Sequence, residues 1–162
     1  MSAAPMLDAE HARFILAPGI SMTAASCAAG NRPELGRVHG CRVTPDCSRV
    51  TVLLPGDQYP ALIDALRQSR AIAVVFSQPS THRTIQLKGV DAAIEPLAGG
   101  DAELASRWLE GFAAELAALG YDETAVRAFD WCDPAGLVAV SFTPCAAFQQ
   151  TPGPRAGAPL SP

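Results

Sequence analysis

Residues 70–96 have the sequence RAIAVVFSQPSTHRTIQLKGVDAAIEP, in which two strand-like segments flank a polar turn. The first segment, 71–76, is almost wholly apolar and partly β-branched, which is typical of a buried strand, and a Ser-Gln-Pro-Ser turn signal follows it. The second segment begins at Thr84 and alternates polar with apolar residues up to Gly89, and a strand period continues to Ile94. This pattern predicts a β-hairpin.

Polar side chains gather at the predicted tip of this hairpin. Ser80, Thr81, His82 and Arg83 supply two hydroxyls, an imidazole and a guanidinium. Such a cluster of donors suits an anion or a cofactor. A hairpin tip that is simply solvated has the same composition, so both interpretations stay open at this point.

Apolar periodicity, capping residues and Gly/Pro turns predict the remaining elements. The other expected strands are 20–27, 34–43, 49–54 and 136–142. The expected helices are 9–17 with Asp8 as N-cap, a helix after Pro55-Gly56 with Asp57 as N-cap, 102–119 with Asp101 as N-cap, and a short turn over 123–128. Six strands without βαβ alternation predict a mainly β, α+β fold in which a six-stranded antiparallel sheet curls into a small barrel and the helices pack outside.

Length and composition limit the class of protein. The 162 residues suit one compact domain over 1–149, and residues 150–162 are too rich in proline and glycine for regular structure. We expect this end segment either to be flexible or to fold over a pocket or a partner subunit. The chain is 49% apolar and 17% charged, with net charge −4 and a single lysine, Lys88, which argues against nucleic-acid binding.

Targeting and metal signals are missing from the sequence. No apolar run is long enough to span a bilayer, and Asp8 and Glu10 lie where a signal peptide would be basic, so we expect a cytoplasmic protein without membrane contact. Five irregularly spaced cysteines predict free thiols. His39-x-Cys41 with Cys47 lacks the C-x-x-C pairs of a structural zinc site, so we expect no metal.

Common catalytic and phosphate-binding motifs are also missing: the chain has no G-x-S-x-G, no P-loop and no G-x-G-x-x-G after a strand. It offers instead basic and hydroxyl groups on predicted strands. These groups suit a phosphorylated cofactor whose own ring carries out redox chemistry.

The order of an apolar strand, an S-x-P turn and the strand T-x-R-T-x-Q-L-K-G, preceded by a helix and two strands of which the first holds Arg37 and Arg42, resembles the pyridoxamine 5'-phosphate oxidase-like flavoproteins. The resemblance covers roughly residues 12–150. It implies an FMN-binding split β-barrel, a homodimer with the cofactor at the subunit interface, and an oxidoreductase acting on a small, unidentified substrate.

The resemblance also implies which residues hold FMN. Arg37 and Arg42 match, in type and spacing, an arginine and a basic residue five positions later that hold the phosphate and flavin ring. Arg83 and Thr84 match polar residues on the later strand. Gln86, on the same strand face as Thr84, could touch a ring edge or another chain.

One departure from the family lies at the start of the helix after Gly56. Where the family usually has a hydroxyl and a cation, this chain has Asp57-Gln58-Tyr59-Pro60. A phosphate there would meet free backbone N–H groups, but Asp57 would repel it, and Gln58 and Tyr59 could donate hydrogen bonds instead. Two further interpretations therefore stay open beside the flavin oxidoreductase: a non-enzymatic dimeric binding protein that has lost flavin, and a haem-binding split barrel with His82 as the ligand.

Overall fold

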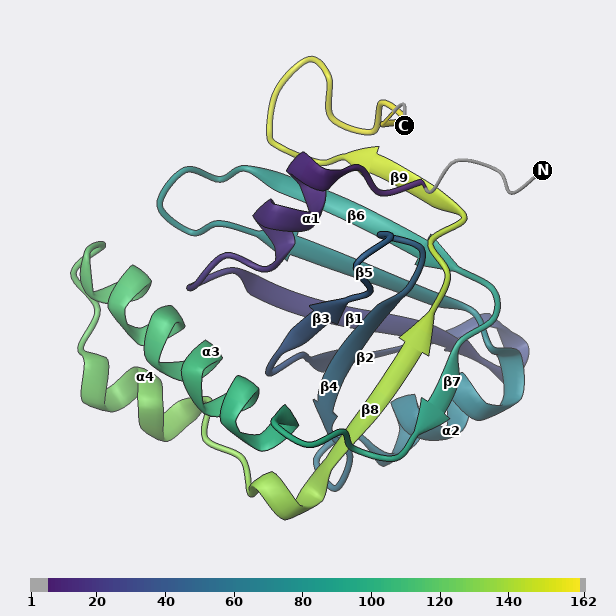
Figure 1. Ribbon diagram of the computed structural model, residues 1–162, viewed down its shortest axis with the longest axis horizontal. Helices are drawn as coiled ribbons and strands as arrows, with labels where there is room; N and C mark the ends of the chain where they lie inside the picture. The colour runs from purple at the N-terminus through teal and green to yellow at the C-terminus, as the bar shows by residue number, and fades with distance from the viewer. Residues whose placement is uncertain (1–5, 161–162) are drawn as a thin grey trace.

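The computed structural model describes residues 6–160 as an α+β fold of two antiparallel sheets and four α-helices (Figure 1). The α-helices are α1 (Ala9–Ile15), α2 (Pro60–Ser69), α3 (Asp101–Ala117) and α4 (Glu123–Phe129), and short 3-10 turns span Ala29–Asn31 and Pro134–Gly136. The strands are β1 (Ser21–Ala28), β2 (Arg32–Arg37), β3 (Cys41–Val43), β4 (Val50–Pro55), β5 (Ile72–Ser77), β6 (Thr84–Gly89), β7 (Ala93–Glu95), β8 (Leu137–Phe142) and β9 (Ala146–Gln149). No helix within residues 6–160 is long and apolar enough to cross a membrane.

The nine strands divide between a five-stranded sheet, β2-β1-β5-β6-β9, and a four-stranded sheet, β3-β4-β8-β7, whose strands cross those of the first sheet in Figure 1. The α+β class is therefore confirmed, but the arrangement differs from the six strands that the sequence predicts. The expected hairpin is present up to Gly89, because β5 and β6 pair in antiparallel register with Val74 opposite Leu87. The strand period expected to continue to Ile94 does not stay in this sheet, because β7 pairs with β8 in the four-stranded sheet.

The strand expected over 34–43 is split between the two sheets. The Val38 N–H donates to the Met22 carbonyl of β1, at 3.0 Å, whereas the next residue, His39, donates to the Leu53 carbonyl of β4, at 2.8 Å. Because neighbouring backbone groups bond to different sheets, the chain passes from one sheet to the other at this point. The residues on either side become β2 and β3.

Two of the expected helix caps are wrong. Helix α2 begins at Pro60, and Tyr59 occupies the N-cap position without a side-chain hydrogen bond, so Asp57 does not cap it. Proline suits the first helical position because its fixed φ and missing N–H cost nothing there. Asp101 is the first residue of α3 rather than its cap, and its carboxylate accepts a hydrogen bond from the Ala98 N–H at 2.8 Å. Asp8 caps α1 as predicted.

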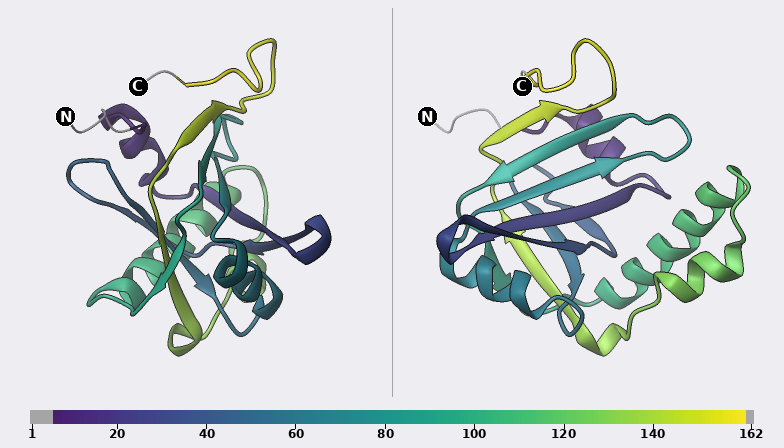
Figure 2. Two further views of the ribbon diagram at one scale, coloured as in Figure 1. Left: turned by 90° about the vertical axis from the view of Figure 1, so that its right-hand side faces the viewer. Right: turned by 180° about the vertical axis from the view of Figure 1, so that it is seen from behind.

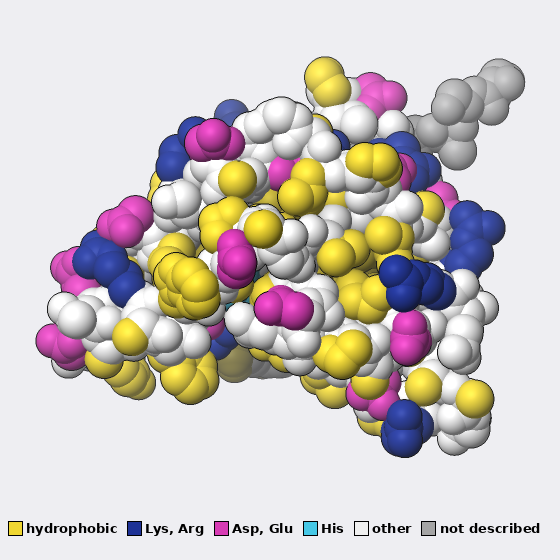
Figure 3. Space-filling model, turned by 90° about the horizontal axis from the view of Figure 1, so that it is seen from below, with side chains coloured by type: hydrophobic (Ala, Val, Ile, Leu, Met, Phe, Trp, Pro, Cys, Tyr) yellow, Lys and Arg dark blue, Asp and Glu magenta, His cyan; other side chains and the backbone are white. Residues whose placement is uncertain are grey.

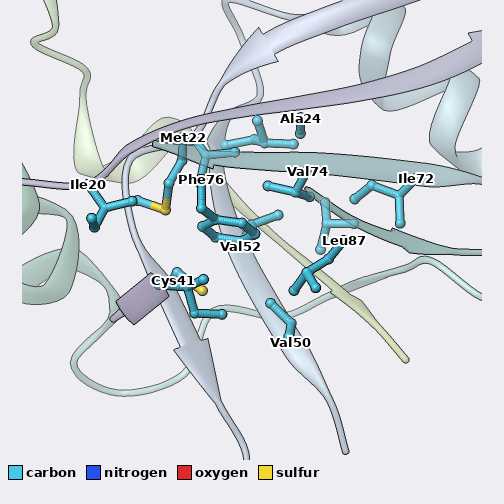
Figure 4. Close-up of a cluster of buried hydrophobic side chains, with 14 of the residues drawn as sticks. Ile20, Met22, Ala24, Cys41, Val50, Val52, Ile72, Val74, Phe76 and Leu87 are labelled. Carbon is cyan, nitrogen blue, oxygen red and sulfur yellow. The ribbon is translucent and has the colours of Figure 1, made fainter. Parts of the chain in front are cut away.

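The hydrophobic core lies between the two sheets, where their inner faces meet (Figure 4). Met22, Val74 and Phe76 from the five-stranded sheet face Val50 and Val52 of β4, and all five are almost completely buried. Each large apolar side chain buried in this way contributes roughly 1.5–3 kcal/mol. The core therefore holds the two sheets together.

Strand β4 is buried on both faces. Its other face meets α3, where Leu53 and Ala139 pack with Ala105 in a second, smaller apolar cluster. The indole N–H of Trp108 donates to the Ile20 carbonyl at 2.7 Å, which ties α3 to the residue that precedes β1. Helix α3 is thus fixed to both sheets, and it carries α4 with it.

The outer face of the five-stranded sheet has no helix lying across it among the described residues, as the right-hand view of Figure 2 shows. Alternate residues of its central strands point to this face and are half-exposed or exposed, among them Ala25, Ala73, Val75 and Lys88. The face is mixed: β1 and β5 contribute Ala25, Ala73 and Val75, whereas β6 contributes Gln86 and Lys88.

Residues after β9 turn back along its free edge. The Gly157 N–H donates to the Gln149 carbonyl at 2.7 Å, and the Leu160 N–H donates to the Ala147 carbonyl at 2.9 Å. The Thr151 hydroxyl accepts a hydrogen bond from the Thr84 N–H at 2.9 Å, which ties the segment to β6. The Pro/Gly-rich segment therefore covers the edge of the sheet, and its role over a pocket or a partner subunit stays a prediction.

A glycine in β2 gives a direct test of the packing of α2 against the five-stranded sheet. A Cβ atom at Gly36 would lie 2.8 Å from the Leu62 side chain and from the Tyr59 ring. We expect Gly36→Ala to lower the free energy of unfolding by about 1–3 kcal/mol through overpacking, and the melting temperature by several degrees. Gly99→Ala is the matched control, because nothing lies within 4 Å of a Cβ there, and it should be neutral or slightly stabilising. Equal melting temperatures for the two variants would contradict this packing.

Candidate functional site

Arg37, the last residue of β2, lies where β1, α3 and α4 meet. Its Nε atom lies 3.0 Å from a carboxylate oxygen of Asp130, the residue that follows α4. Its Nη1 atom donates to the Ser21 hydroxyl at 3.0 Å, and its guanidinium carbon lies 5.3 Å from the centre of the Phe112 ring. The Arg37 side chain, 28% exposed, is therefore held by β1, by α3 and by the residue that follows α4.

An open groove of about 410 Å³ lies over this guanidinium. Besides Arg37, its walls are two carboxylates and apolar or aromatic side chains, namely Asp122, Asp130, Phe112, Leu116, Tyr121, Ala125, Val126 and Phe129. Tyr121 is 62% exposed and Phe129 is 83% exposed. Figure 3 shows large hydrophobic side chains on the side of the molecule where α3 and α4 lie, with acidic and basic groups among them. Exposed aromatic rings beside a cation are suited to a planar aromatic ligand.

The carboxylate of Asp130 opposes the charge of Arg37. The side chain of Asp130 is only 6% exposed. Burial raises the pKa of the Asp130 carboxyl, and this effect outweighs the attraction of Arg37, which lowers it. A cation and two carboxylates line the groove, so its formal charge is negative when both carboxyls are ionised.

Arg42 does not join this groove. It lies on β3, in the other sheet, and its Nε atom donates to the Asp101 carboxylate at 3.0 Å. Asp101 is buried and also accepts from the Ala98 N–H at the start of α3. Arg42 therefore neutralises a buried carboxylate that orders the start of a helix, and it lies apart from Arg37, the other arginine predicted to hold the phosphate and flavin ring.

Arg83 and His82 lie at the hairpin tip, beside α1. The Arg83 Nη2 atom donates to Glu10 at 3.0 Å, and its guanidinium carbon lies 4.5 Å from the centre of the Phe14 ring. His82 is exposed and has a positive φ of 59°. The Thr84 hydroxyl bonds to the Ser77 hydroxyl at 2.6 Å. These residues form a separate place on the molecule, away from the lining of the Arg37 groove.

The remaining residues that were predicted to hold FMN, Gln58, Tyr59 and Gln86, do not line the Arg37 groove either. Gln86 is half-buried in the middle of β6, on the outer face of the five-stranded sheet. Tyr59 is half-buried against Gly36. The side-chain amide of Gln58 reaches the Trp131 carbonyl at 3.5 Å, so Gln58 lies beside the segment that holds Asp130.

A contact between His39 and Cys132, which no motif in the sequence predicts, lies beside Asp130. The His39 Nδ1 atom lies 3.1 Å from the Cys132 sulfur, and the His39 ring stacks on Trp108 with the ring centres 4.9 Å apart. Burial, followed by the charge of Arg37, lowers the pKa of His39 to about 4. Burial and then the charges of Asp57 and Asp133 raise the pKa of Cys132.

Both members of the His39–Cys132 pair are therefore uncharged near neutral pH, and the pair is a structural hydrogen bond rather than an activated thiolate. Together with Arg37 and Gln58, His39 anchors the three consecutive residues 130–132. No three His, Cys, Asp or Glu side chains among residues 6–160 are grouped to hold a metal ion. The only signal in the sequence was the chemical type of these residues, because the contact joins positions far apart in the chain.

No family model matches the sequence, and no curated protein matches it. Solved structures do match. HupZ from Group A Streptococcus has a TM-score of 0.56 and 14% identity over 93% of this chain and 100% of its own. A candidate pyridoxamine 5'-phosphate oxidase from Lactobacillus delbrueckii has a TM-score of 0.52 and 13% identity over 88% of this chain and 93% of its own. An F420 reductase has a TM-score of 0.52 and 14% identity over 83% of this chain and 94% of its own.

These matches show a shared fold. The chain has the pyridoxamine 5'-phosphate oxidase-like split-barrel fold, which confirms at the level of fold the resemblance noted in the sequence. Activity does not follow from a fold shared at such low identity.

The burial of His39 predicts a particular pH dependence of stability. The pKa of His39 is about 4 in the folded chain and about 6.5 when it is unfolded, so the unfolded chain binds a proton more readily between these values. This contribution is fully present above about pH 6.5 and is lost as the pH falls towards 4, by up to about 3 kcal/mol.

The measurement is thermal unfolding across this pH range for the natural sequence, His39→Asn and His82→Asn. We expect His39→Asn to melt lower at every pH but with a flatter pH profile. His82→Asn is the control, because His82 is exposed and asparagine tolerates its positive φ. The account of His39 is wrong if the His39→Asn profile is as steep as that of the natural sequence.

Proposed function

We propose that this protein binds a flavin-class cofactor, FMN being the one predicted from the sequence, with its ring in the groove over Arg37. The observation that carries the proposal is a partly buried arginine, Arg37, that lines a groove of about 410 Å³ together with exposed aromatic side chains. The resemblance noted in the sequence implies a more specific function, which we also propose: an oxidoreductase that acts on a small substrate.

The groove suits the ring of a flavin. A planar heterocycle can stack on the exposed rings of Tyr121 and Phe129, and grooves of several hundred Å³ are typical of cofactor sites. A bound flavin supplies hydride or electron transfer. The residues of this chain would bind the ring, orient it and exclude water from one of its faces.

The fit to the phosphate of FMN is poorer. Arg37 already lies beside a carboxylate, and Asp57 is exposed before α2, where no basic residue stands. The other two predicted arginines are also paired, Arg42 with Asp101 and Arg83 with Glu10. The site therefore supports ring binding more strongly than phosphate binding.

A homodimer would complete the site. The outer face of the five-stranded sheet carries the apolar side chains Ala25, Ala73 and Val75 on β1 and β5, and Leu35 on the edge strand β2 is 58% exposed. Arg37 lies two residues along the same strand, opposite Thr23 of β1. A second copy on this face would therefore reach the margin of the groove. The resemblance to split-barrel flavoproteins implies the same position for the cofactor, between two chains.

The paired arginines favour one alternative, a dimeric split barrel that binds no flavin and is not an enzyme. In that protein the three ion pairs would serve the fold alone. Thermal unfolding distinguishes the two functions. Added FMN would raise the melting temperature of a flavin-binding protein and leave that of the flavin-free protein unchanged.

Flavin fluorescence tests the groove directly. We expect flavin-free protein to quench FMN saturably, with a low micromolar or tighter Kd. Phe129→Ala should weaken binding by about 0.5–1.5 kcal/mol or more, because a stacking ring is lost from an exposed position that the fold does not need. The matched control is Leu97→Ala, an exposed apolar residue that does not line the groove. Equal Kd values for the two variants would place the ligand elsewhere, and absence of quenching would favour the flavin-free alternative.

The dimer is tested by a charge placed on the proposed interface. If a second copy covers this face, Leu35→Glu buries a carboxylate in the interface. We therefore expect the dissociation constant of the dimer to rise at least tenfold, which corresponds to a loss of about 1.4 kcal/mol or more of binding free energy. Sedimentation or light scattering over a concentration series measures the shift. Leu97→Glu introduces the same charge elsewhere and should leave the dimer intact. A monomeric natural protein, or two variants with equal dissociation constants, would contradict this interface.

A further inference from the structure

We propose that Asp130 sets the ligand specificity of the Arg37 groove, so that a flavin without a phosphate group, such as riboflavin, binds at least as tightly as FMN. This inference rests on the proposed function, because it names the class of flavin that the same groove accepts. It concerns a residue that the sequence did not single out.

Three side chains already surround the guanidinium of Arg37. Asp130 lies 3.0 Å from Nε, Ser21 accepts from Nη1 at 3.0 Å, and Phe112 packs against the guanidinium at 5.3 Å from its ring centre. Arginine binds a phosphate by presenting a fork of N–H groups to it. Here one edge of the guanidinium already faces a carboxylate, so a phosphate could approach this charge only by competing with Asp130.

The charges of the side chains that line the groove also disfavour a phosphate. Among the described residues that line the groove, Arg37 is the one cation, whereas Asp122 and Asp130 are both carboxylates. A phosphate monoester adds about −1.5 to −2 charges at neutral pH. A phosphate that displaced Asp130 would leave a carboxylate that is only 6% exposed without its partner, which is a strongly unfavourable state. A neutral ring avoids both penalties.

Contacts of Asp130 and of the two residues after it hold this segment in place. Its own N–H donates to the Val126 carbonyl at 3.0 Å and ends α4. The next residue, Trp131, accepts a hydrogen bond from Gln58, and Cys132 contacts His39. The segment on both sides of the carboxylate is thus anchored, and Asp130 does not move out of the groove without breaking these contacts. It acts as a permanent counter-ion of Arg37.

The experiment compares the Kd values of riboflavin and FMN by fluorescence quenching for the natural protein, Asp130→Asn and Asp122→Asn. For the natural protein we expect riboflavin to bind as tightly as FMN or more tightly. Asp130→Asn keeps the shape of the side chain and removes its charge, so FMN should bind about tenfold more tightly or better, as expected for a charge-assisted contact, while riboflavin changes by less than about threefold.

Asp122→Asn is the matched control. It removes the same charge from the same groove, and asparagine retains the capping hydrogen bond that Asp122 accepts from the Ala125 N–H. Because Asp122 makes no ion pair with Arg37, the preference for FMN should rise less than in Asp130→Asn. Melting curves show whether each variant folds, and Asp130→Ser replaces Asp130→Asn if the latter does not.

Two results would overturn the inference: a natural protein that binds FMN at least tenfold more tightly than riboflavin, or an Asp130 variant in which both flavins gain equally or FMN gains nothing. A natural protein that binds neither flavin would refute the proposed function instead. In that case FMN binding acquired by the Asp130 variant would still support the role of Asp130, and continued absence of binding would overturn it.

Discussion

The burial of β4 on both faces is the constraint on which the rest of the structure depends. One face of this strand meets the five-stranded sheet in the main core, and the other meets α3. A strand buried on both faces requires a cover on each side, so α3 is held against it. Helix α3 then carries Phe112 to Arg37 and places α4 over the end of β2. The candidate groove is thus a consequence of how β4 is covered.

The sequence predicted local elements well, for local reasons. The hairpin of β5 and β6 and the cap of α1 depend on alternation, turn residues and a side chain three positions away. The passage of the chain between sheets after Arg37 could not be predicted, because no proline or Asn/Asp-Gly turn signal interrupts residues 34–43 and the change lies only in which strand accepts each N–H. Strand β9 was not predicted, because its four residues are too few to show the alternation of polar and apolar side chains that marks a strand.

The predicted FMN-binding role of the arginines stays a prediction, but the structure shows where each of them lies. Arg37 lines a groove, whereas Arg42 and Arg83 pair with carboxylates away from it. Each arginine has a carboxylate partner from a distant part of the chain, and no local pattern shows that pairing. A basic residue in a family motif is therefore a candidate for anion binding only if its charge is unopposed in the folded chain. For Arg37, Asp130 opposes that charge.

A flavin-class ring in the groove over Arg37 would be visible by its absorption. The first measurement is therefore the visible absorption spectrum of freshly purified protein, followed by chromatography of what the protein releases on denaturation. The account predicts the absorption bands of a bound flavin and the recovery of that flavin from the denatured protein. Colourless protein that releases no flavin would contradict the account, and a Soret band in place of flavin bands would contradict it in favour of haem.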